Sequence, residues 1–355
     1  MTNSNGNGVS GFSDRKIRAL ITGGAGFLGS HLAEGLLKEG HEVLILDDLS
    51  TGNVENLREL KTYDGLQYFI DSVGNRSLLA ELVDDCDIIF HLAAAVGVRL
   101  IVESPVHTIE TNVTGTEIVL KAANKKKKPV FVASTSEVYG KSTQVPFRED
   151  DDLVLGTTTK GRWSYAASKL LDEFLALAYW KEKKLPVIVA RFFNIVGPRQ
   201  SGRYGMVLPS FVSQAIAGED VTVFGTGQQT RCFCYVGDAV QAILGLIGRP
   251  EAIGQIFNIG SNREISIEDL AHQVITRVHS RSKVRYIPYE MAYEQGFEDM
   301  LRRVPALEKI AGLTGWQPVT TLDTSIDLVA QYLEEKTRRL EKKLAPRESS
   351  RAAGL

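Results

Sequence analysis

Residues 17–33, IRALITGGAGFLGSHLA, decide the fold, because an apolar run there passes through four glycines into a helical pattern. We expect a strand over Ile17–Thr22 and a helix over Phe27–Glu39. The glycines between them permit a tight turn, close approach of a diphosphate to the backbone, and close packing of helix on sheet. Free N–H groups in the first helical turn would then bind phosphate oxygens. This stretch therefore predicts a dinucleotide site at the first strand–helix junction.

Apolar runs continue to alternate with helical patterns up to about residue 193. Such alternation predicts right-handed crossovers and a doubly wound parallel sheet, the Rossmann-type α/β class. Several runs, such as Val43–Leu46, are apolar throughout, which is typical of strands covered on both faces. Further strands are expected at Glu42–Asp47, Leu66–Ile70, Asp87–Leu92, Pro129–Ser134, Val187–Phe193 and Gln255–Ile259, and further helices at Thr108–Ala123 and Ser164–Lys183.

The pattern changes after about residue 191, where short strand-like pieces such as Val221–Phe224 and Val284–Ile287 mix with turns and helices. We interpret this part as a smaller α+β region that interleaves with the sheet domain in sequence. The predicted boundaries are 15–190, completed by about 236–262, for the dinucleotide-binding domain, 191–235 and 263–340 for the substrate-binding region, and 1–14 and 341–355 for disordered tails.

Composition excludes several classes of protein. Lys and Arg number 41 against 43 Asp and Glu, so no net basic charge favours nucleic acid or an anionic membrane. No apolar run approaches the roughly 18–20 residues that span a bilayer, and the Asn/Gly/Ser-rich N-terminus is not typical of a signal peptide. Three cysteines argue against a disulfide framework, and six scattered histidines show no metal-ligand spacing. We expect a cytoplasmic protein without a metal site.

An acidic pair, Asp47-Asp48, ends the second expected strand, about 20 residues beyond the glycines. An acidic side chain at this place can bind both hydroxyls of the adenosine ribose. It would also repel a 2′-phosphate, and no arginine follows it immediately. The pair therefore favours NAD over NADP as the cofactor.

Tyr165 and Lys169 lie four residues apart in the expected helix Ser164–Lys183, which places them on one face. A phenol has a pKa of about 10, and a neighbouring ammonium group favours its ionised form. Alone, this spacing more often marks a surface pair, but beside a dinucleotide loop it indicates a catalytic base. Ser136 and Glu137 follow the fifth strand, where they face a ligand or merely cap a turn.

In their order, these motifs resemble the extended short-chain dehydrogenase/reductases that modify nucleotide sugars, over roughly residues 16–335. The matching motifs are TGGAGFLGSH (22–31), HLAA (91–94), STSEVYG (134–140), Tyr165-xxx-Lys169 and Arg191-xx-Asn194-xx-Gly197-Pro198-Arg199. The resemblance implies a catalytic set of Thr135, Ser136, Glu137, Tyr165 and Lys169. It implies NAD contacts at Gly23, Gly26, Phe27, Leu28, Gly29, Asp47, Asp71, Ser72, Leu92, Ala93, Ala94, Asn112, Tyr165 and Lys169, and substrate contacts at Asn194, Arg199, Arg231 and Arg303.

Within this family, the Thr135-Ser136-Glu137 set resembles UDP-glucuronate decarboxylases. Dehydratases usually carry Asp-Glu in place of Ser136-Glu137, and simple 4-epimerases carry a small or hydroxyl residue at Glu137. The segments RWSY (162–165), QTRCF (229–233), GFED (296–299) and RRVP (302–305) also resemble that subgroup. The implied activity is decarboxylation of UDP-glucuronate to UDP-xylose. The alternatives are 4-epimerisation, of UDP-glucose and UDP-galactose or of UDP-glucuronate and UDP-galacturonate, and a non-catalytic NAD-sensing module on the same fold.

The resemblance also assigns roles. Tyr165 would remove the proton of the sugar O4 as C4 is oxidised, and Tyr165 and Thr135 would stabilise the enolate that forms when the carboxylate leaves. Glu137, or a water that it orients, would supply the proton to C5. Arg231 would hold either the departing carboxylate or the diphosphate. The implied partners are a UDP-sugar and a second copy of the chain, bound through the Thr108–Ala123 and Ser164–Lys183 helices.

Overall fold

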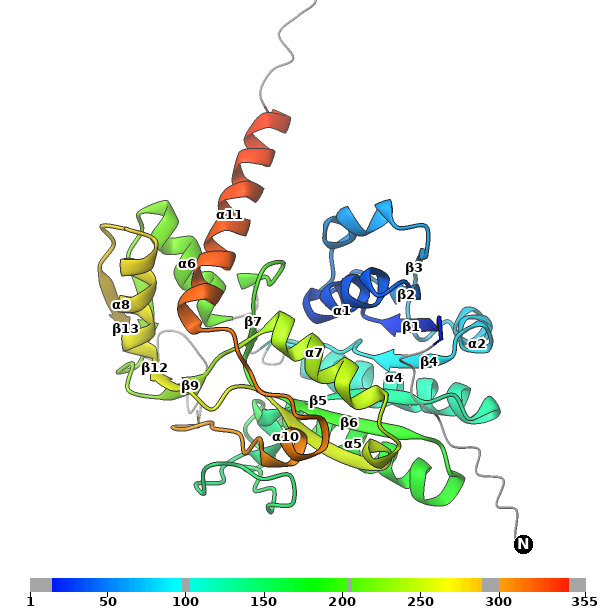
Figure 1. The fold of residues 1–355 in the computed structure, drawn as a ribbon. Helices are drawn as coiled ribbons and strands as arrows, with labels where there is room; N and C mark the ends of the chain where they lie inside the picture. The colour runs from blue at the N-terminus through cyan, green and yellow to red at the C-terminus, as the bar shows by residue number, and fades with distance from the viewer. Residues whose placement is uncertain (1–14, 98–102, 203–205, 289–299, 345–355) are drawn as a thin grey trace, which may run out of the picture.

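The computed structural model describes residues 15–97, 103–202, 206–288 and 300–344, and a seven-stranded sheet lies at its centre (Figure 1). All neighbouring strands pair in parallel, in the order β11-β6-β5-β4-β1-β2-β3, which confirms the predicted doubly wound α/β class. The chain order reverses between β1 and β4, where such sheets bind ligands. The strands are β1 (Arg18–Thr22), β2 (Glu42–Asp47), β3 (Leu66–Ile70), β4 (Ile88–His91), β5 (Val130–Thr135), β6 (Val187–Phe192) and β11 (Gln255–Ile259).

The central strands are apolar throughout because helices cover both faces of the sheet (Figure 1). Leu20 and Leu44 pack with α2, α4 and α5, whereas Ile21 and Ile45, one residue further along, pack with α1, α7 and α10. The first set is α2 (Arg76–Asp85), α4 (Pro105–Lys126) and α5 (Trp163–Lys183), and the second is α1 (Phe27–Lys38), α7 (Val236–Ile247) and α10 (Glu308–Thr314). The turns η2 (Val54–Leu57), η3 (Glu59–Thr62), η4 (Ser136–Tyr139) and η6 (Pro250–Ala252) are 3-10 helices.

A second region packs beside the carboxyl ends of these strands and has its own apolar core between α6, α8 and α11 (Figure 1). Three two-stranded ladders accompany the helices: β7 with β10 and β8 with β13 are parallel, and β9 with β12 is antiparallel. The strands at Val221–Phe224 and Val284–Ile287 have the predicted bounds. The elements are β7 (Ile195–Val196), α6 (Val207–Ala217), β8 (Val221–Phe224), β9 (Thr230–Cys232), β10 (Cys234–Tyr235), β12 (Glu264–Ser266), α8 (Ile267–Arg277), β13 (Val284–Ile287) and α11 (Leu322–Leu344).

Helix α11 connects the second region with the loops after β2. Ile326 and Val329 in its first half join the core formed with α6 and α8. Its second half continues past that core, and Arg339 forms an ion pair with Glu59 of η3, with 3.8 Å between Nη1 and Oε1. The helix therefore contacts both regions of the chain.

The predicted disordered tail, 341–355, begins too early, because residues 341–344 continue α11. Ion pairs four residues apart, such as Arg338 with Glu334 at 3.6 Å, support the exposed end of this helix. The predicted tails 1–14 and 345–355 and the predicted substrate segment 296–299 lie outside the described residues.

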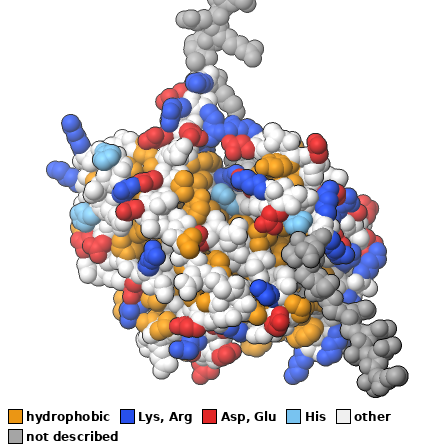
Figure 2. All heavy atoms as spheres, in the orientation of Figure 1, with side chains coloured by type: hydrophobic (Ala, Val, Ile, Leu, Met, Phe, Trp, Pro, Cys, Tyr) orange, Lys and Arg blue, Asp and Glu red, His pale blue; other side chains and the backbone are white. Residues whose placement is uncertain are grey.

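Acidic and basic side chains are interspersed over the face of the molecule shown in Figure 2. Among the described residues, no helix is both long and apolar enough to cross a membrane.

A buried ion pair fixes α5 to the sheet. The guanidinium group of Arg191 on β6 binds the carboxylate of Glu173 on α5, with 2.8 Å from Nη2 to Oε2 and 3.0 Å from Nε to Oε1. Both side chains are only 3% exposed. The Ser134 hydroxyl of β5 donates to the same carboxylate, and Arg191 lies 4.8 Å above the ring of Tyr139. One helix and two strands are therefore held together by a single carboxylate.

We predict that Glu173→Gln lowers the free energy of unfolding by about 3–5 kcal/mol, because Arg191 would be left as a buried cation without its partner. Urea denaturation followed by circular dichroism measures this change. Glu117→Gln is the matched control, since Glu117 pairs with Lys121 on the exposed face of α4, and its midpoint should stay at the wild-type value. Equal midpoints for wild type and Glu173→Gln would contradict the prediction.

Candidate active site

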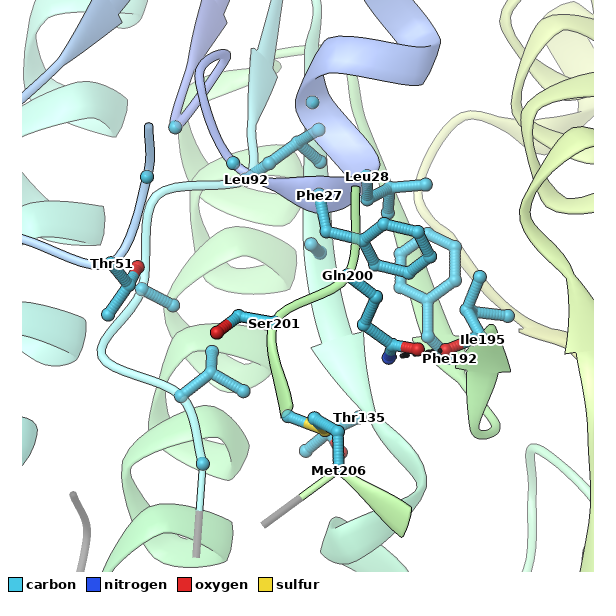
Figure 3. Close-up of a pocket in the computed structure, with 18 of the residues that line it drawn as sticks. Phe27, Leu28, Thr51, Leu92, Thr135, Phe192, Ile195, Gln200, Ser201 and Met206 are labelled. Atoms are coloured by element: carbon cyan, nitrogen blue, oxygen red, sulfur yellow. Dashed lines mark hydrogen bonds between the residues drawn. The ribbon is translucent and has the colours of Figure 1, made fainter. Parts of the chain in front are cut away.

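A cavity of about 1870 Å³ runs along the carboxyl ends of the sheet strands and extends into the second region. Its lining comes from the loops after β1, β2, β3, β4, β5 and β6, and from α6, β9 and α11. Figure 3 shows part of it, with Phe27, Leu28 and Leu92 in the upper part of the view and Thr135 below them. The cavity thus lies where a doubly wound sheet is expected to bind its ligand.

The glycine loop between β1 and α1 forms one end of the cavity. Gly23 has a φ of +74°, and a Cβ atom there would lie 2.7 Å from the Ala93 nitrogen. A Cβ atom on Gly29 would overlap the Gly23 carbonyl oxygen. Gly26 precedes α1 without a side-chain cap, so the positive end of the helix dipole is open to an anion. These features fit the predicted role of the loop in diphosphate binding.

Most of the predicted cofactor contacts come together around this loop. Asp47 ends β2, and its carboxylate accepts hydrogen bonds from Ala25 N at 2.9 Å and Leu49 N at 2.8 Å. Burial raises the pKa of Asp47, while these backbone donors lower it. The predicted contacts that line the same cavity are Gly23, Gly26, Phe27, Leu28, Gly29, Asp47, Asp71, Ser72, Leu92, Ala93, Ala94, Tyr165 and Lys169.

Asn112 differs from this set, because it is 1% exposed and does not line the cavity. Its amide oxygen accepts a hydrogen bond from Ala95 N at 2.8 Å, and its amide nitrogen donates to the Ser168 hydroxyl at 3.0 Å. Asn112 therefore ties the segment after β4 to α5. In this structure it supports the cavity wall from behind, and its contact with the cofactor stays a prediction.

Thr135 at the end of β5 and Tyr165 and Lys169 on α5 lie together, as predicted. Burial raises the pKa of Tyr165 and the charge of Glu137 raises it further, whereas a hydrogen bond with Thr135 lowers it. The Lys169 ammonium group donates to Asp172 Oδ2 at 2.6 Å. In the absence of a ligand, the phenol is therefore protonated at neutral pH.

Glu137 lies at the start of η4 and is held between two arginines. Arg303 Nη2 lies 2.7 Å from one carboxylate oxygen, and Arg162 Nη2 lies 3.2 Å from the other. Burial alone would raise the pKa of Glu137, but the charges of Arg303, Arg162 and Arg231 lower it to about 2. The neighbouring Ser136 is buried. Glu137 is therefore ionised at neutral pH and cannot itself donate a proton in this arrangement.

Arg162 contacts Glu137 in the cavity, but the sequence predicted no role for it beyond membership of the RWSY segment. Its contact with Glu137 joins positions 25 residues apart. Its position immediately before α5 is the sequence signal that could have identified it, because α5 carries Tyr165 into the cavity.

The other predicted substrate residues lie at different parts of the cavity. Arg231 on β9 donates to the carbonyl oxygens of Thr230 at 2.7 Å and Met300 at 2.8 Å, and its charge acts on Glu137. Asn194 follows β6 and donates to the Cys232 carbonyl at 3.0 Å.

Arg199 lies beside α1, where it pairs with Glu34 at 2.6 Å and donates to the Ser30 carbonyl at 3.2 Å. It therefore lies at the glycine-loop end of the cavity, and not in the cluster around Glu137. No group of three His, Cys, Asp or Glu side chains in the described ranges is arranged to hold a metal ion.

We predict a pH-dependent contribution of Glu137 to stability. Its pKa is about 2 in the folded protein and about 4.3 when unfolded, so its contribution is complete above about pH 5 and is lost as the pH falls toward 2. Glu137→Gln should therefore be less stable than wild type by about 3 kcal/mol at pH 7. The difference should shrink below about pH 4.3.

Urea denaturation of both proteins between pH 3.5 and 7 measures this difference. Glu81→Gln, on the exposed face of α2, is the control and should show no pH-dependent difference from wild type. A difference between wild type and Glu137→Gln that stays constant down to pH 3.5 would contradict the assignment.

Known proteins are similar to this chain in sequence and in fold. A family model described as GDP-mannose 4,6 dehydratase matches residues 20–329. A UDP-N-acetyl-alpha-D-glucosaminuronate decarboxylase of Bacillus cytotoxicus is 44% identical over 321 residues, 90% of this chain and 98% of that protein. UDP-glucuronic acid decarboxylase 1 of Danio rerio is 34% identical over 91% of this chain and 74% of that protein.

Two solved structures are similar across nearly the whole chain. Epimerase Mth375 of Methanothermobacter thermautotrophicus has a TM-score of 0.84 and 27% identity, with 92% of this chain and 95% of that chain covered. A UDP-glucuronic acid 4-epimerase of Bacillus cereus, in complex with UDP-glucuronic acid and NAD, has a TM-score of 0.81 and 25% identity, with 90% and 100% covered. The chain therefore belongs to the GDP-mannose 4,6 dehydratase family of extended short-chain dehydrogenase/reductases, as its motifs indicated.

Proposed function

We propose that this protein is an NAD-dependent UDP-hexuronate decarboxylase, which converts UDP-glucuronate to UDP-xylose or acts in the same way on the 2-acetamido sugar. The observation that carries the proposal is the Glu137 carboxylate, buried near Tyr165 among three arginines. The three guanidinium groups and the one carboxylate have a net charge of +2, so this cluster attracts further anionic groups. A substrate that has both a carboxylate and a diphosphate supplies them. The activities named for the relatives support the same proposal.

The glycine loop and the neighbouring strand ends would hold the cofactor. The first turn of α1 faces the cavity, because Gly26, Phe27 and Leu28 at the start of the helix line it. Backbone N–H groups at such a helix start can bind a diphosphate. Asp47 lines the cavity after β2, where an acidic group suits ribose hydroxyls. Asp71 and Ser72 line it after β3 and would contact the adenine. Bound NAD would accept hydride from C4 of the sugar and later return it.

The first step needs a base at O4 of the sugar. Tyr165 would take this proton, with the Thr135 hydroxyl holding the phenol oxygen in place. Because burial and Glu137 raise the pKa of Tyr165, the base needs cations nearby when it acts. Lys169 lies one helical turn from Tyr165 and would supply one of them.

The second step breaks the bond between C5 and the carboxylate of the 4-keto sugar. The electron pair of that bond moves into the C4 ketone, and carbon dioxide leaves. Tyr165 and Thr135 would donate hydrogen bonds to the enolate oxygen. Arg231 and Arg303 would hold the carboxylate before it departs, since a guanidinium group binds a carboxylate in a fork.

The third step adds a proton to C5. Because the pKa of Glu137 is about 2, we assign the proton to a water molecule that Glu137 orients, and not to the carboxyl group itself. Return of hydride to C4 and of the proton from Tyr165 to O4 would complete the pentose. The overall reaction consumes one proton from solvent and leaves the cofactor unchanged.

The test is incubation of the NAD-loaded protein with UDP-glucuronate, UDP-N-acetylglucosaminuronate and UDP-glucose, followed by proton NMR of the products. We expect a UDP-pentose and carbon dioxide from at least one of the two hexuronates. Glu137→Gln should lower carbon dioxide release by about 100-fold, the scale of a lost acid–base contribution, and should leave NAD binding unchanged. Calorimetric titration measures that binding.

Glu81→Gln, exposed on α2, is the control and should release carbon dioxide at the wild-type rate. Equilibration of UDP-sugars at C4 with no loss of carbon would establish the 4-epimerase instead. Undiminished carbon dioxide release by Glu137→Gln would remove the role assigned to that residue.

We also propose a homodimer through α4 and α5, which pack side by side. Large apolar side chains on these helices face solvent in the single chain: Val106 is 66% exposed, Ile109 41%, Leu171 54% and Phe174 65%. Exposed apolar side chains gathered on adjacent elements are typical of an interface. A second copy placed against the same helices would bury all four side chains in a four-helix contact.

We predict that Phe174→Glu shifts the protein from dimer to monomer, because a carboxylate would be buried without a partner in the contact. Size-exclusion chromatography with light scattering measures the mass. Val319→Glu changes an apolar residue that is even more exposed, at 76%, and lies outside these helices, so it should leave the dimer intact. A wild-type protein that runs as a monomer at all concentrations tested would rule out the interface.

We retain the cytoplasm as the proposed location. Cys86, Cys232 and Cys234 are all buried free thiols. Unpaired cysteines are typical of a reducing compartment.

A further inference from the structure

Asp172 is a buried carboxylate that the proposed reaction does not use. It lies on α5 three residues after Lys169, and its Oδ2 accepts a hydrogen bond from the Lys169 ammonium group at 2.6 Å. The side chain of Asp172 is 0% exposed and that of Lys169 is 3% exposed. A charge so far from solvent is retained only with a partner, and here the partner is the predicted catalytic lysine.

A chain of polar contacts holds Asp172 from the side of the sheet. The Thr116 hydroxyl of α4 stabilises its carboxylate, and His91 Nε2 on β4 lies 3.1 Å from Thr116 Oγ1. Burial lowers the pKa of His91 to about 3, so the ring is neutral. The other ring nitrogen, Nδ1, lies 2.8 Å from the Thr22 hydroxyl oxygen. Asp172 is therefore fixed through β4 to β1, beside the glycine loop.

Other charged side chains lie near Asp172 and Tyr165, on α5 and on the elements packed against it. On α5, the carboxylate of Glu173 next to Asp172 is bound by Arg191 of β6. From η4, Glu137 raises the pKa of Tyr165, and Arg303 lowers it. Asp172 also raises the pKa of Tyr165. The ammonium group that should favour an ionised phenol thus has its charge offset by the carboxylate of Asp172.

We propose that Asp172 is a positioning residue: it holds the Lys169 ammonium group against the wall formed by β4 and α4, one helical turn from Tyr165. This inference rests on the proposed function, in which Tyr165 is the base. Asp172 touches neither substrate nor cofactor in this scheme, and acts only through Lys169 and Tyr165.

Asp172→Asn keeps the size of the side chain and removes its charge. Because Asp172 raises the pKa of Tyr165, the acidic limb of the pH profile of kcat/KM should move to lower pH by about half a unit or more. The value of kcat at the optimum should fall by about tenfold, since Lys169 loses its anchor, with KM for the UDP-sugar changed by less than about threefold.

Glu182→Gln is the matched control, because it makes a carboxylate-to-amide change on the same helix at an exposed position. It should leave both the unfolding temperature and the acidic limb at their wild-type values. An acidic limb that is unmoved in a folded Asp172→Asn protein, or moved equally by Glu182→Gln, would overturn the proposal.

A second measurement needs no substrate or cofactor. Thermal unfolding is compared for wild type, Lys169→Met, Asp172→Asn and the double variant. Each single change leaves one member of a buried pair without its partner, so we expect each to lower the unfolding temperature. The double variant should unfold at a higher temperature than Lys169→Met, because it removes both charges.

Unfolding temperatures that fall additively would overturn the pairing of Asp172 with Lys169. This outcome differs from failure of the proposed function, in which wild type releases no carbon dioxide from either hexuronate while the unfolding temperatures still show the coupling. Coupled unfolding temperatures together with a shifted acidic limb support the positioning role.

Discussion

The ion pair between Glu173 on α5 and Arg191 on β6 is the interaction on which the candidate site depends. Helix α5 presents Tyr165, Lys169 and Asp172 toward the cavity and α4, and the placement of these side chains follows from the placement of the helix. Apolar packing would allow a helix to slide or rotate by a fraction of an ångström, since it is non-directional. A forked contact from a guanidinium group to a carboxylate is directional, so the pair restricts how α5 can lie on the sheet.

Electrostatics divides the site into two parts with different balances of charge. Around Glu137 the positive groups are in excess, which suits a substrate with several negative charges. Around Lys169 the single ammonium group is matched by the single carboxylate of Asp172. The carboxylates of both parts, Glu137 and Asp172, raise the pKa of Tyr165. Burial and these two carboxylates raise the pKa of Tyr165, so cations near the phenol are needed for it to act as a base.

The sequence was sufficient to predict the parts of this molecule that depend on neighbours along the chain. Continuous apolar runs such as Val43–Leu46 predicted buried parallel strands, and the glycines at 23–29 predicted the turn that opens the cavity, because both follow from local sterics and burial. The four-residue spacing of Tyr165 and Lys169 placed both side chains on one face for the same reason.

The sequence could not predict contacts that depend on the packing of distant elements. Arg162 and Arg303 meet on Glu137, and Arg199 meets Glu34 on α1 across 165 residues. Asn112 was expected to contact the cofactor, yet its amide is taken by Ala95 and Ser168. In each case the identity of the partner is set by the tertiary arrangement, and a charged or amide side chain alone does not specify it.

Helix α11 joins the two regions of the chain by different kinds of contact at its two ends. Its first half is fixed by apolar burial, whereas its far half contacts η3 through the ion pair of Arg339 and Glu59. An exposed ion pair is worth about 0–1 kcal/mol and is weakened by salt. Higher ionic strength should therefore weaken the contact between α11 and η3, whereas the apolar core that α11 shares with α6 and α8 does not depend on salt in this way.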